Sequence, residues 1–459
     1  MIHRYQKKGL NFVLDVNSGA VHLLDDISYA VSGLLDENMG DTCPQSIIDA
    51  LPDYTADEIR EAYGELYELK KAGQLFAQDD YIDVSRYIPV NAPVKALCLH
   101  VAHDCNLRCK YCFASTGDFG QGRKIMPPEI AKKAIDFVIA RSGVRHNIEV
   151  DFFGGEPLMA WDTVTQTVDY ARSLEEKYNK KFRFTITTNG LLLDEDKRKY
   201  INENMDNCVL SLDGRREVND EFRKTVAGTG SYDTIVPKFK ALVDERDPNL
   251  DYYARGTFTS HNLDFAEDVL SIADAGFDRL SVEPVTADPG CGYDLTEDDL
   301  PKIEAEYDRL TDIMLERKKE GKPFTFFHFM VDLDQGPCVV KRLRGCGAGY
   351  EYVAVTPDGD IYPCHQFVGK DEFKQGSVLD QSFNMDIAQK FAGMNIYSRP
   401  KCQKCWAKFY CSGGCSAANY NMNHDMNDSY DLGCEMERKR LECAIYLKAM
   451  DKICANQSK

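Results

Sequence analysis

The sequence lacks any apolar run of the ~20 residues that a membrane-spanning helix needs. Its first residues, MIHRYQKKGLNFVLDV, lack the uninterrupted apolar core of a secretory signal peptide. An excess of positive charge is absent as well, since the net charge is −19. Because binding to nucleic acid or to an anionic membrane depends on Lys and Arg, we expect no nucleic-acid partner, no membrane association and a cytoplasmic location.

Low-complexity tracts are also missing, and the composition is that of a globular protein, with 43% hydrophobic and 28% charged residues. A chain of 459 residues exceeds the size at which one core usually stops growing, so we expect two or three domains. What the chain has in excess is cysteine, with 17 residues. In a reducing compartment so many cysteines indicate metal ligands rather than disulfides.

Residues 1–87 read as a small α+β module. LNFVLDV and AVHLLD alternate as two strands around NSGA, and helical periodicity follows in SIIDAL and then from Thr55, the expected N-cap, to Gly73, the expected stop. This winged-helix-like order occurs in DNA-binding domains and in domains that bind a peptide as an added strand. The last helix is rich in Glu and carries no cluster of Lys and Arg, which favours peptide recognition over DNA reading or a structural cap.

Strands and helices alternate in residues 94–290, after the proline-punctuated linker Arg86–Val94. Helical stretches such as PPEIAKKAIDFVIARS separate six strand candidates, which are 96–102, 148–154, 182–188, 208–213, 252–259 and 279–285. Six such units in series predict an α/β fold with a parallel sheet, curved as a partial barrel. In such barrels the chemistry lies at the C-terminal ends of the strands.

The alternation stops near Thr286. A bridging region, 291–345, contains one long helix candidate at 297–321, and the cysteine-dense region 346–459 follows it. Because this last region is rich in turns, we expect it to form little apolar core and to be held together by metal centres.

The stretch CNLRCKYC places Cys105, Cys109 and Cys112 directly after the first strand of the barrel. Three thiolates in a short loop can hold three corners of a [4Fe-4S] cluster and leave the fourth iron open, as a catalytic metal site requires. The alternative is a zinc loop that a distant residue such as His103 completes.

The C-x3-C-x2-C spacing at this place in a β/α chain resembles the radical S-adenosylmethionine (SAM) superfamily. The resemblance implies that Cys105, Cys109 and Cys112 hold the catalytic cluster, and that the open iron binds SAM and releases a 5′-deoxyadenosyl radical. The motifs GGEP, TTNG and SLDG end the next three strands, where relatives line the SAM pocket. The cofactor-binding residues that the resemblance implies are Tyr111, Gly154, Gly155, Glu156, Thr187, Asn189, Ser211 and Arg223.

The cysteine order of the last region resembles the SPASM domain, which carries two further [4Fe-4S] clusters and brings the expected total to three. Half a zinc ribbon would explain one C-x2-C pair but not the whole series. By the family's ligation, the inner cluster would take Cys346, Cys364 and Cys415, with Cys338 or a substrate thiolate as fourth ligand. The outer cluster would take Cys402, Cys405, Cys411 and Cys434.

Six cysteines remain outside these sets, and we expect them to be small buried apolar residues. One of them lies in the flexible-looking stretch DPGCGYD, where its thiol could meet substrate or act as a transient base. The six are Cys43, Cys98, Cys208, Cys291, Cys443 and Cys454, and the one in that stretch is Cys291.

Over its whole length the chain resembles the SCIFF maturases, named for peptides with six cysteines in forty-five residues. The start of the chain and the segment DGDIYPCHQFVG carry this likeness. It implies a radical SAM enzyme that joins a cysteine sulfur to a threonine α-carbon in a ribosomally made precursor peptide, whose leader binds the N-terminal module. The reaction removes two electrons from the peptide, an auxiliary cluster can accept one, and flavodoxin or ferredoxin would reduce the enzyme.

Other functions stay open, and one of them is that of another SPASM enzyme that modifies a peptide. A sulfatase-type maturase would oxidise Cys or Ser to formylglycine, but that family has an acidic residue where this chain has His365. An iron-sulfur-sensing transcription regulator would use the N-terminal module on DNA. The acidic chain and a barrel that a sensor does not need argue against the regulator.

Overall fold

The computed structural model describes residues 1–87, 92–333 and 339–457. Residues 88–91 of the expected linker and Cys338 lie outside this part of the chain. Within it, no helix combines the length and the apolar character needed to cross a membrane.

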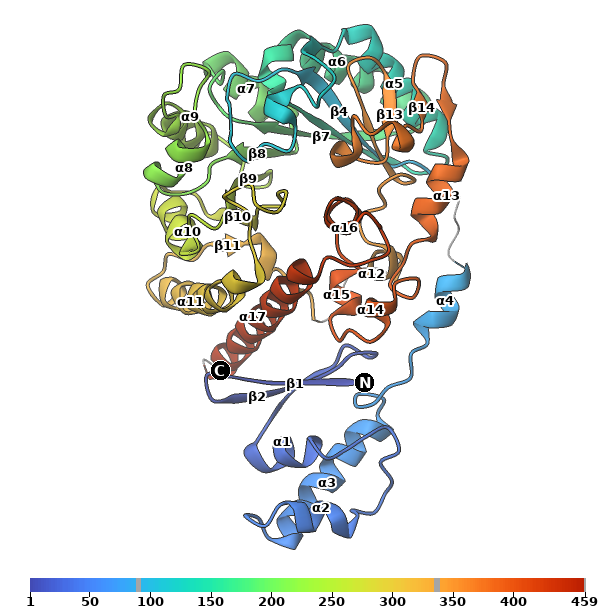
Figure 1. Ribbon diagram of the computed structural model, residues 1–459, viewed down its shortest axis with the longest axis vertical. Helices are drawn as coiled ribbons and strands as arrows, with labels where there is room; N and C mark the ends of the chain where they lie inside the picture. Colours follow the sequence, from blue (N-terminus) through green and yellow to red (C-terminus); the bar gives the residue numbers. More distant parts are fainter. Residues whose placement is uncertain (88–91, 334–338, 458–459) are drawn as a thin grey trace.

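The N-terminal module is a three-stranded antiparallel sheet in the order β1-β2-β3, followed by three helices (Figure 1). Two of these strands were predicted, and the first, β1, was not. The Thr55 hydroxyl and Glu58 form a capping box at the start of α3, and Gly73 follows its end with φ +69°, as expected. The elements are β1 Ile2–Lys7, β2 Leu10–Asp15, β3 Val21–Leu24, α1 Asp26–Ser32, α2 Gln45–Ala50 and α3 Ala56–Lys71.

The module packs against the last helix of the chain, α17 (Asp431–Gln457). Tyr5 and Phe12 from β1 and β2 form one buried cluster with Ile445 and Tyr446 of this helix. Figure 1 shows α17 between the module and the rest of the molecule. A short helix, α4 (Tyr81–Tyr87), precedes the central sheet.

The central sheet contains all six predicted strands, and neighbouring strands among them run parallel. Helices cover its outer face (Figure 1). The strands are β4 Ala96–His103, β6 Asn147–Gly154, β7 Lys181–Thr188, β8 Asn207–Ser211, β9 Asp251–Phe258 and β10 Arg279–Pro284. The helices are α5 Pro128–Arg141, α6 Trp161–Tyr178, α7 Glu195–Asn204, α8 Arg216–Phe222, α9 Tyr232–Asp244 and α10 Phe265–Asp274.

Further strands extend this sheet at both edges. After α11 (Leu300–Lys319), the predicted long helix, β11 (Thr325–Phe326) pairs in parallel with β10. At the other edge, β12 (Tyr352–Val355) of the cysteine-dense region pairs in parallel with β4. The remaining strands are β5 Lys124–Ile125, β13 Asp360–Tyr362, β14 Gly376–Ser377 and β15 Ser382–Phe383.

Strand β4 is buried along its whole length because it is covered on both faces. Leu97, Leu99 and Val101 belong to the core between the sheet and its helices. Cys98 belongs to a second core that the cysteine-dense region supplies. The first strand of the barrel therefore lies between the helices and the tail.

The tail has an apolar core, so the expectation that it forms little apolar core was wrong. Phe367 and Phe373 pack with ring centroids 4.4 Å apart, and Phe391 and Ala354 lie in the same buried cluster. The turn-rich sequence hid this core because its aromatic residues come from short, separate segments. Besides α17, the helices are α12 Val339–Arg344, α13 Met385–Gly393, α14 Pro400–Gln403, α15 Lys408–Cys411 and α16 Ser416–Asn423.

Candidate active site

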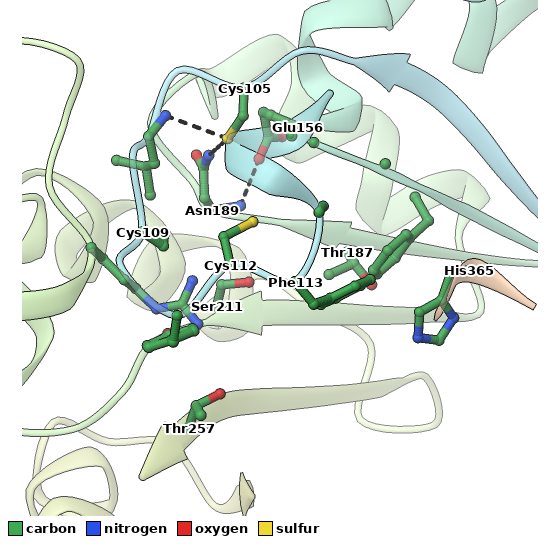
Figure 2. A pocket seen from close by; sticks show the side chains of 18 of the residues that line it. Cys105, Cys109, Cys112, Phe113, Glu156, Thr187, Asn189, Ser211, Thr257 and His365 are labelled. Carbon is green, nitrogen blue, oxygen red and sulfur yellow. Dashed lines mark hydrogen bonds between the residues drawn. The ribbon is translucent and has the colours of Figure 1, made fainter. Parts of the chain in front are cut away.

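The three cysteines of the loop after β4 line one cavity at the C-terminal ends of the barrel strands (Figure 2). Its volume is about 230 Å³. All eight residues that the sequence predicted for SAM binding also line this cavity, namely Tyr111, Gly154, Gly155, Glu156, Thr187, Asn189, Ser211 and Arg223. The predicted catalytic and cofactor-binding residues are therefore brought together in one place.

The sulfur of Cys105 accepts two N–H groups. The Leu107 backbone N lies 3.4 Å from Sγ, and Nδ2 of Asn189 lies 3.5 Å from it. Burial raises the pKa of Cys105 and of Cys109 to about 12, so these thiols need a bound cation to ionise. Donors aimed at sulfur are typical of the surroundings of iron-sulfur clusters.

The two glycines of GGEP allow the end of β6 to lie against the backbone that leaves β4. A Cβ on Gly154 would lie 2.2 Å from the carbonyl oxygen of Ala102, and one on Gly155 would lie 2.2 Å from that of Asp104. The Gly155 N–H donates to the Ala102 carbonyl at 2.7 Å. Any side chain at these positions would push the GGEP turn away from the cysteine loop.

Glu156 is fully buried and its carboxylate is occupied by the chain itself. It accepts hydrogen bonds from the Leu158 N–H at 3.0 Å, the Thr188 hydroxyl at 2.8 Å and the Asn189 N–H at 2.7 Å. Burial raises the pKa of Glu156 to about 7, although these donors oppose the rise. Since Asn189 also donates to Cys105, Glu156 connects the GGEP turn to the cysteine loop through the end of β7 (Figure 2).

Asp213, in the motif SLDG, organises the opposite wall of the cavity. The Tyr111 hydroxyl donates to its carboxylate at 2.6 Å, and Nε of Arg223 forms an ion pair with it at 3.0 Å. The Thr257 N–H donates to the same carboxylate at 3.0 Å. The sequence prediction included Tyr111 and Arg223 but missed the buried carboxylate that orients both.

Four of the remaining cavity residues, none of them predicted to bind a ligand, come from the last barrel strands and from the tail. Arg255 lies in the C-terminal half of β9 and Glu283 near the end of β10, while His365 and Gln366 come from the tail. The position of Arg255 and Glu283 near the C-terminal ends of barrel strands was the one signal that could have indicated them.

His103, the residue proposed to complete a zinc loop, does not line this cavity. Its ring nitrogen Nε2 lies 3.2 Å from Nδ1 of His100, and its ring packs against Phe119. Both histidines are fully buried, and burial lowers the pKa of His103 to about 4. The geometry therefore does not support the zinc alternative.

A second cavity, of about 300 Å³, brings together the four cysteines predicted for the outer cluster. These are Cys402, Cys405, Cys411 and Cys434. The Ser429 hydroxyl lies 3.5 Å from the Cys402 sulfur, and Arg438 approaches the Cys405 sulfur at 4.0 Å. In the described ranges no three His, Cys, Asp or Glu side chains are grouped as they would be around a single metal ion; these cysteines surround a cavity instead.

The three cysteines predicted for the inner cluster also lie near one another. Burial and the neighbouring Cys415 and Cys346 raise the pKa of the Cys364 thiol. Arg399 lies between the inner and outer groups, with its guanidinium donating to the Gly413 carbonyl at 2.7 Å. Cys338 lies outside the described residues, so the fourth ligand stays a prediction.

The expectation that the six other cysteines are buried holds for three of them, Cys98, Cys208 and Cys443. It was wrong for Cys291 and Cys454, which are exposed, and Cys43 is only partly buried. Cys291 is exposed in its loop, 3.8 Å from the carboxylate of Asp294, and it does not line the cavity.

Two family models match this chain. Residues 99–251 match the radical SAM superfamily, and residues 346–406 match SPASM, an iron-sulfur cluster-binding domain. The chain carries a radical SAM domain and a SPASM domain. The radical SAM match includes the cysteine loop, GGEP, TTNG and SLDG. Cavities lined by three or four thiols fit the SAM and iron-sulfur clusters that these domains bind.

Several known proteins are similar to this chain over 72% or more of its length. A cysteine-type anaerobic sulfatase-maturating enzyme of Clostridium novyi is 25% identical over 354 residues, covering 72% of this chain and 90% of that enzyme. The solved structure of native anSMEcpe with bound AdoMet and Kp18Cys peptide has a TM-score of 0.64 and 21% identity, covering 78% and 99% of the two chains. Streptococcus suis SuiB bound to precursor peptide SuiA has a TM-score of 0.53 and 17% identity, covering 94% and 98%.

Proposed function

We propose that this chain is a radical SAM maturase that joins a cysteine sulfur to a threonine α-carbon in a cysteine-rich precursor peptide of the SCIFF type. One observation carries the proposal. A single cavity is lined by the three-cysteine loop, by the GGEP turn and by His365 and Gln366 of the SPASM region. The SPASM region therefore reaches the cavity in which the radical would form. A reaction in which an auxiliary cluster accepts an electron needs the two regions to lie this close together.

The residues that line the cavity have different roles. Cys105, Cys109 and Cys112 would hold the catalytic cluster, which together with SAM supplies a 5′-deoxyadenosyl radical when bound. Glu156 fixes the Asn189 backbone, and the Asn189 amide in turn contacts the Cys105 sulfur. Asp213 and Glu156 thus keep the polar groups on both walls in place before any ligand binds.

Gly154, Gly155, Thr187 and Ser211 would line the SAM molecule together with Tyr111 and Arg223. Gly154 and Gly155 bring the GGEP turn close to the cysteine loop, and Asp213 orients Tyr111 and Arg223. The tail would hold two further [4Fe-4S] clusters through the inner and outer cysteine groups, with Cys338 or a substrate thiolate completing the inner one. The expected electron donor is a flavodoxin or ferredoxin, and the expected compartment is the reducing cytoplasm.

The N-terminal module, interpreted as winged-helix-like, would bind the leader of the peptide. In the described residues the outer edge of β3 pairs with no other strand, and the Leu23 side chain on it is 43% exposed. A groove of about 470 Å³ runs between β3 and the end of α17. An extended leader could add to this edge by main-chain hydrogen bonds and place its side chains in the groove.

A second candidate is the oxidation of Cys or Ser to formylglycine. The similarity to the Clostridium novyi sulfatase-maturating enzyme favours it. Against it stands His365, which occupies the position after Cys364 where that family has an acidic residue. Burial lowers the pKa of His365 to about 4, so its imidazole is neutral and carries no negative charge at neutral pH.

The test is anaerobic incubation with SAM, a reductant and a cysteine-rich precursor peptide. Thioether formation predicts 5′-deoxyadenosine and a peptide that is lighter by two hydrogens and has one fewer alkylatable thiol. Formylglycine formation predicts a product that reacts with an aldehyde-specific hydrazide instead. A lighter peptide with every thiol still alkylatable would rule out the thioether.

A further inference from the structure

Arg255 and Glu283 form an ion pair in the wall of the active-site cavity. Nε of Arg255 donates to one carboxylate oxygen of Glu283 at 2.9 Å, and one terminal nitrogen of Arg255 donates to the other. Neither residue belongs to the set that the family resemblance relates to SAM. That set lies on β6 to β8, in the turns that follow β6 and β7, and in the loops that follow β4 and α8. The resemblance therefore gives the pair no role, although both residues line the same cavity.

Residues behind the pair hold it in place. Ser281 Oγ lies 3.4 Å from Oε1 of Glu283 and 3.3 Å from Nε2 of His328. Nδ1 of His328 lies 3.2 Å from a guanidinium nitrogen of Arg440 on α17. Because Arg440 can only donate, Nδ1 accepts and the imidazole proton lies on Nε2, facing Ser281 and Glu283. Contacts that start at Arg440 on α17 thus fix the orientation of the Glu283 carboxylate, and the carboxylate in turn fixes Arg255.

One terminal nitrogen of Arg255 remains available. Within the described residues it donates to no acceptor, while the Arg255 side chain is 45% exposed inside a cavity wall. The cavity that Arg255 lines also contains Arg223 of the SAM side and His365 of the tail. Arg255 therefore presents this nitrogen to a cavity whose walls come from both the barrel and the tail.

We propose that Arg255 binds the substrate peptide by donating to a main-chain carbonyl oxygen next to the carbon that loses hydrogen. This inference rests on the proposed function only in that the substrate is a peptide. A peptide presents a carbonyl oxygen at every residue, and a guanidinium held by a carboxylate gives it a charge-assisted hydrogen bond in a fixed direction. A competing ligand for the same nitrogen is the carboxylate of SAM, which the experiment below distinguishes.

The experiment compares the holoenzyme with Arg255→Lys and Arg255→Met, using a precursor peptide deuterated at every carbon-bound position. The readouts are the fraction of 5′-deoxyadenosine that carries deuterium, the KM for peptide and the Kd for SAM. The matched control is Arg279→Lys. Arg279 pairs with Asp251 at 2.7 Å on the same two strands, β10 and β9, at the opposite end of the sheet.

We expect Arg255→Met to lower the deuterated fraction roughly tenfold and to raise the KM for peptide, as the loss of one charge-assisted hydrogen bond would. The Lys variant should recover part of both, while the Kd for SAM and the iron content stay unchanged. An unaltered deuterated fraction and KM would overturn the proposal, and so would a weaker SAM affinity with normal peptide KM. A wild-type enzyme that transfers deuterium without forming a thioether would refute the proposed function but leave this inference standing.

Discussion

The imidazole of His3 stacks flat on the indole of Trp406, with ring centroids 3.8 Å apart and planes within 2° of parallel. Nε2 of His3 also lies 2.9 Å from the carboxylate of Glu442 on α17. Trp406 directly follows Cys405, one of the four cysteines around the outer cavity. The first strand of the N-terminal module therefore supports the segment that would hold the outer cluster.

Replacing Trp406 with Ala should destabilise the protein and release iron from the outer site. We expect a loss of roughly 3 kcal/mol of unfolding free energy, as for other large-to-small aromatic changes, with fewer irons per chain after reconstitution. Trp161→Ala is the control, because Trp161 is equally half-buried but packs on Tyr200 in the barrel. Thermal melting measures the loss of stability, and iron analysis measures the iron content. Equal iron retention in the two variants would contradict the claim that Trp406 supports the outer cluster site.

Replacing Glu156 with Ala should weaken both the fold and the catalytic site. The change leaves three buried donors without their acceptor, at an expected cost of roughly 3 kcal/mol, and it frees the Asn189 amide that faces Cys105. Glu149→Ala, on the exposed side of the same strand, should change stability by no more than about 0.5 kcal/mol. Denaturation curves and SAM titrations check this, and a Glu156 variant with normal SAM affinity would contradict the role given to this carboxylate.

Replacing Gly155 with Ala should prevent the GGEP turn from packing on the cysteine loop. Because the new Cβ would lie 2.2 Å from the Asp104 carbonyl oxygen, we expect a loss of roughly 3 kcal/mol or more. Gly64→Ala, in helix α3 with nothing within 4 Å, should instead stabilise the protein by about 1 kcal/mol. Gly155→Ala should lower the yield and the melting temperature, and Gly64→Ala should raise the melting temperature. Equal effects of the two changes would mean that the GGEP turn can move to accommodate the new methyl group.

The stability of the protein should fall on acidification, in part through His328. Burial and the adjacent Arg440 and Arg255 lower the pKa of His328 to about 3, while Glu283 opposes them. In the unfolded chain the histidine has its ordinary pKa near 6.5 and takes up a proton as the pH falls below that value, while the buried imidazole stays neutral. The contribution of His328 to stability is therefore complete above pH 6.5 and is lost as the pH falls towards 3. The decrease in melting temperature from pH 7 to pH 5.5 should be smaller in His328→Gln.

The matched control is His146→Gln, on the exposed surface, which should keep the wild-type pH dependence. If His328→Gln showed the same pH dependence as the wild type, the histidine behind Glu283 would not be a buried neutral base. The same result would weaken the case that Arg255 is held rigidly.

Most barrel strands could be predicted from the sequence because they alternate apolar and polar residues between turn signals, whereas β4 is buried throughout. In β6, for example, Ile148, Val150 and Phe152 are fully buried and the residues between them are not. The cysteine motifs could be assigned because their spacing is rare. The predicted SAM-site residues lie together because the C-terminal ends of neighbouring parallel strands meet at one edge.

Other parts could not be predicted for physical reasons. Helix α17 contacts α11, the N-terminal sheet and the outer cysteine cavity, so its buried residues lie on several faces and give no single apolar stripe. Arg255 and Glu283 are single charged residues that no motif marks, and SLDG does not show that its Asp213 orients Tyr111 and Arg223. Their roles depend on distances between strands that only the folded chain defines.

The most direct test of the central claim uses a precursor peptide in which only the α-carbons of threonine carry deuterium. After anaerobic turnover, tandem mass spectrometry of the alkylated product locates the deuterium that was lost and the cysteine that resists alkylation. Thioether formation predicts that one threonine has lost its α-deuterium and is joined to that cysteine. A modified product that keeps every α-deuterium, or that carries an aldehyde at a former Cys or Ser, would contradict it.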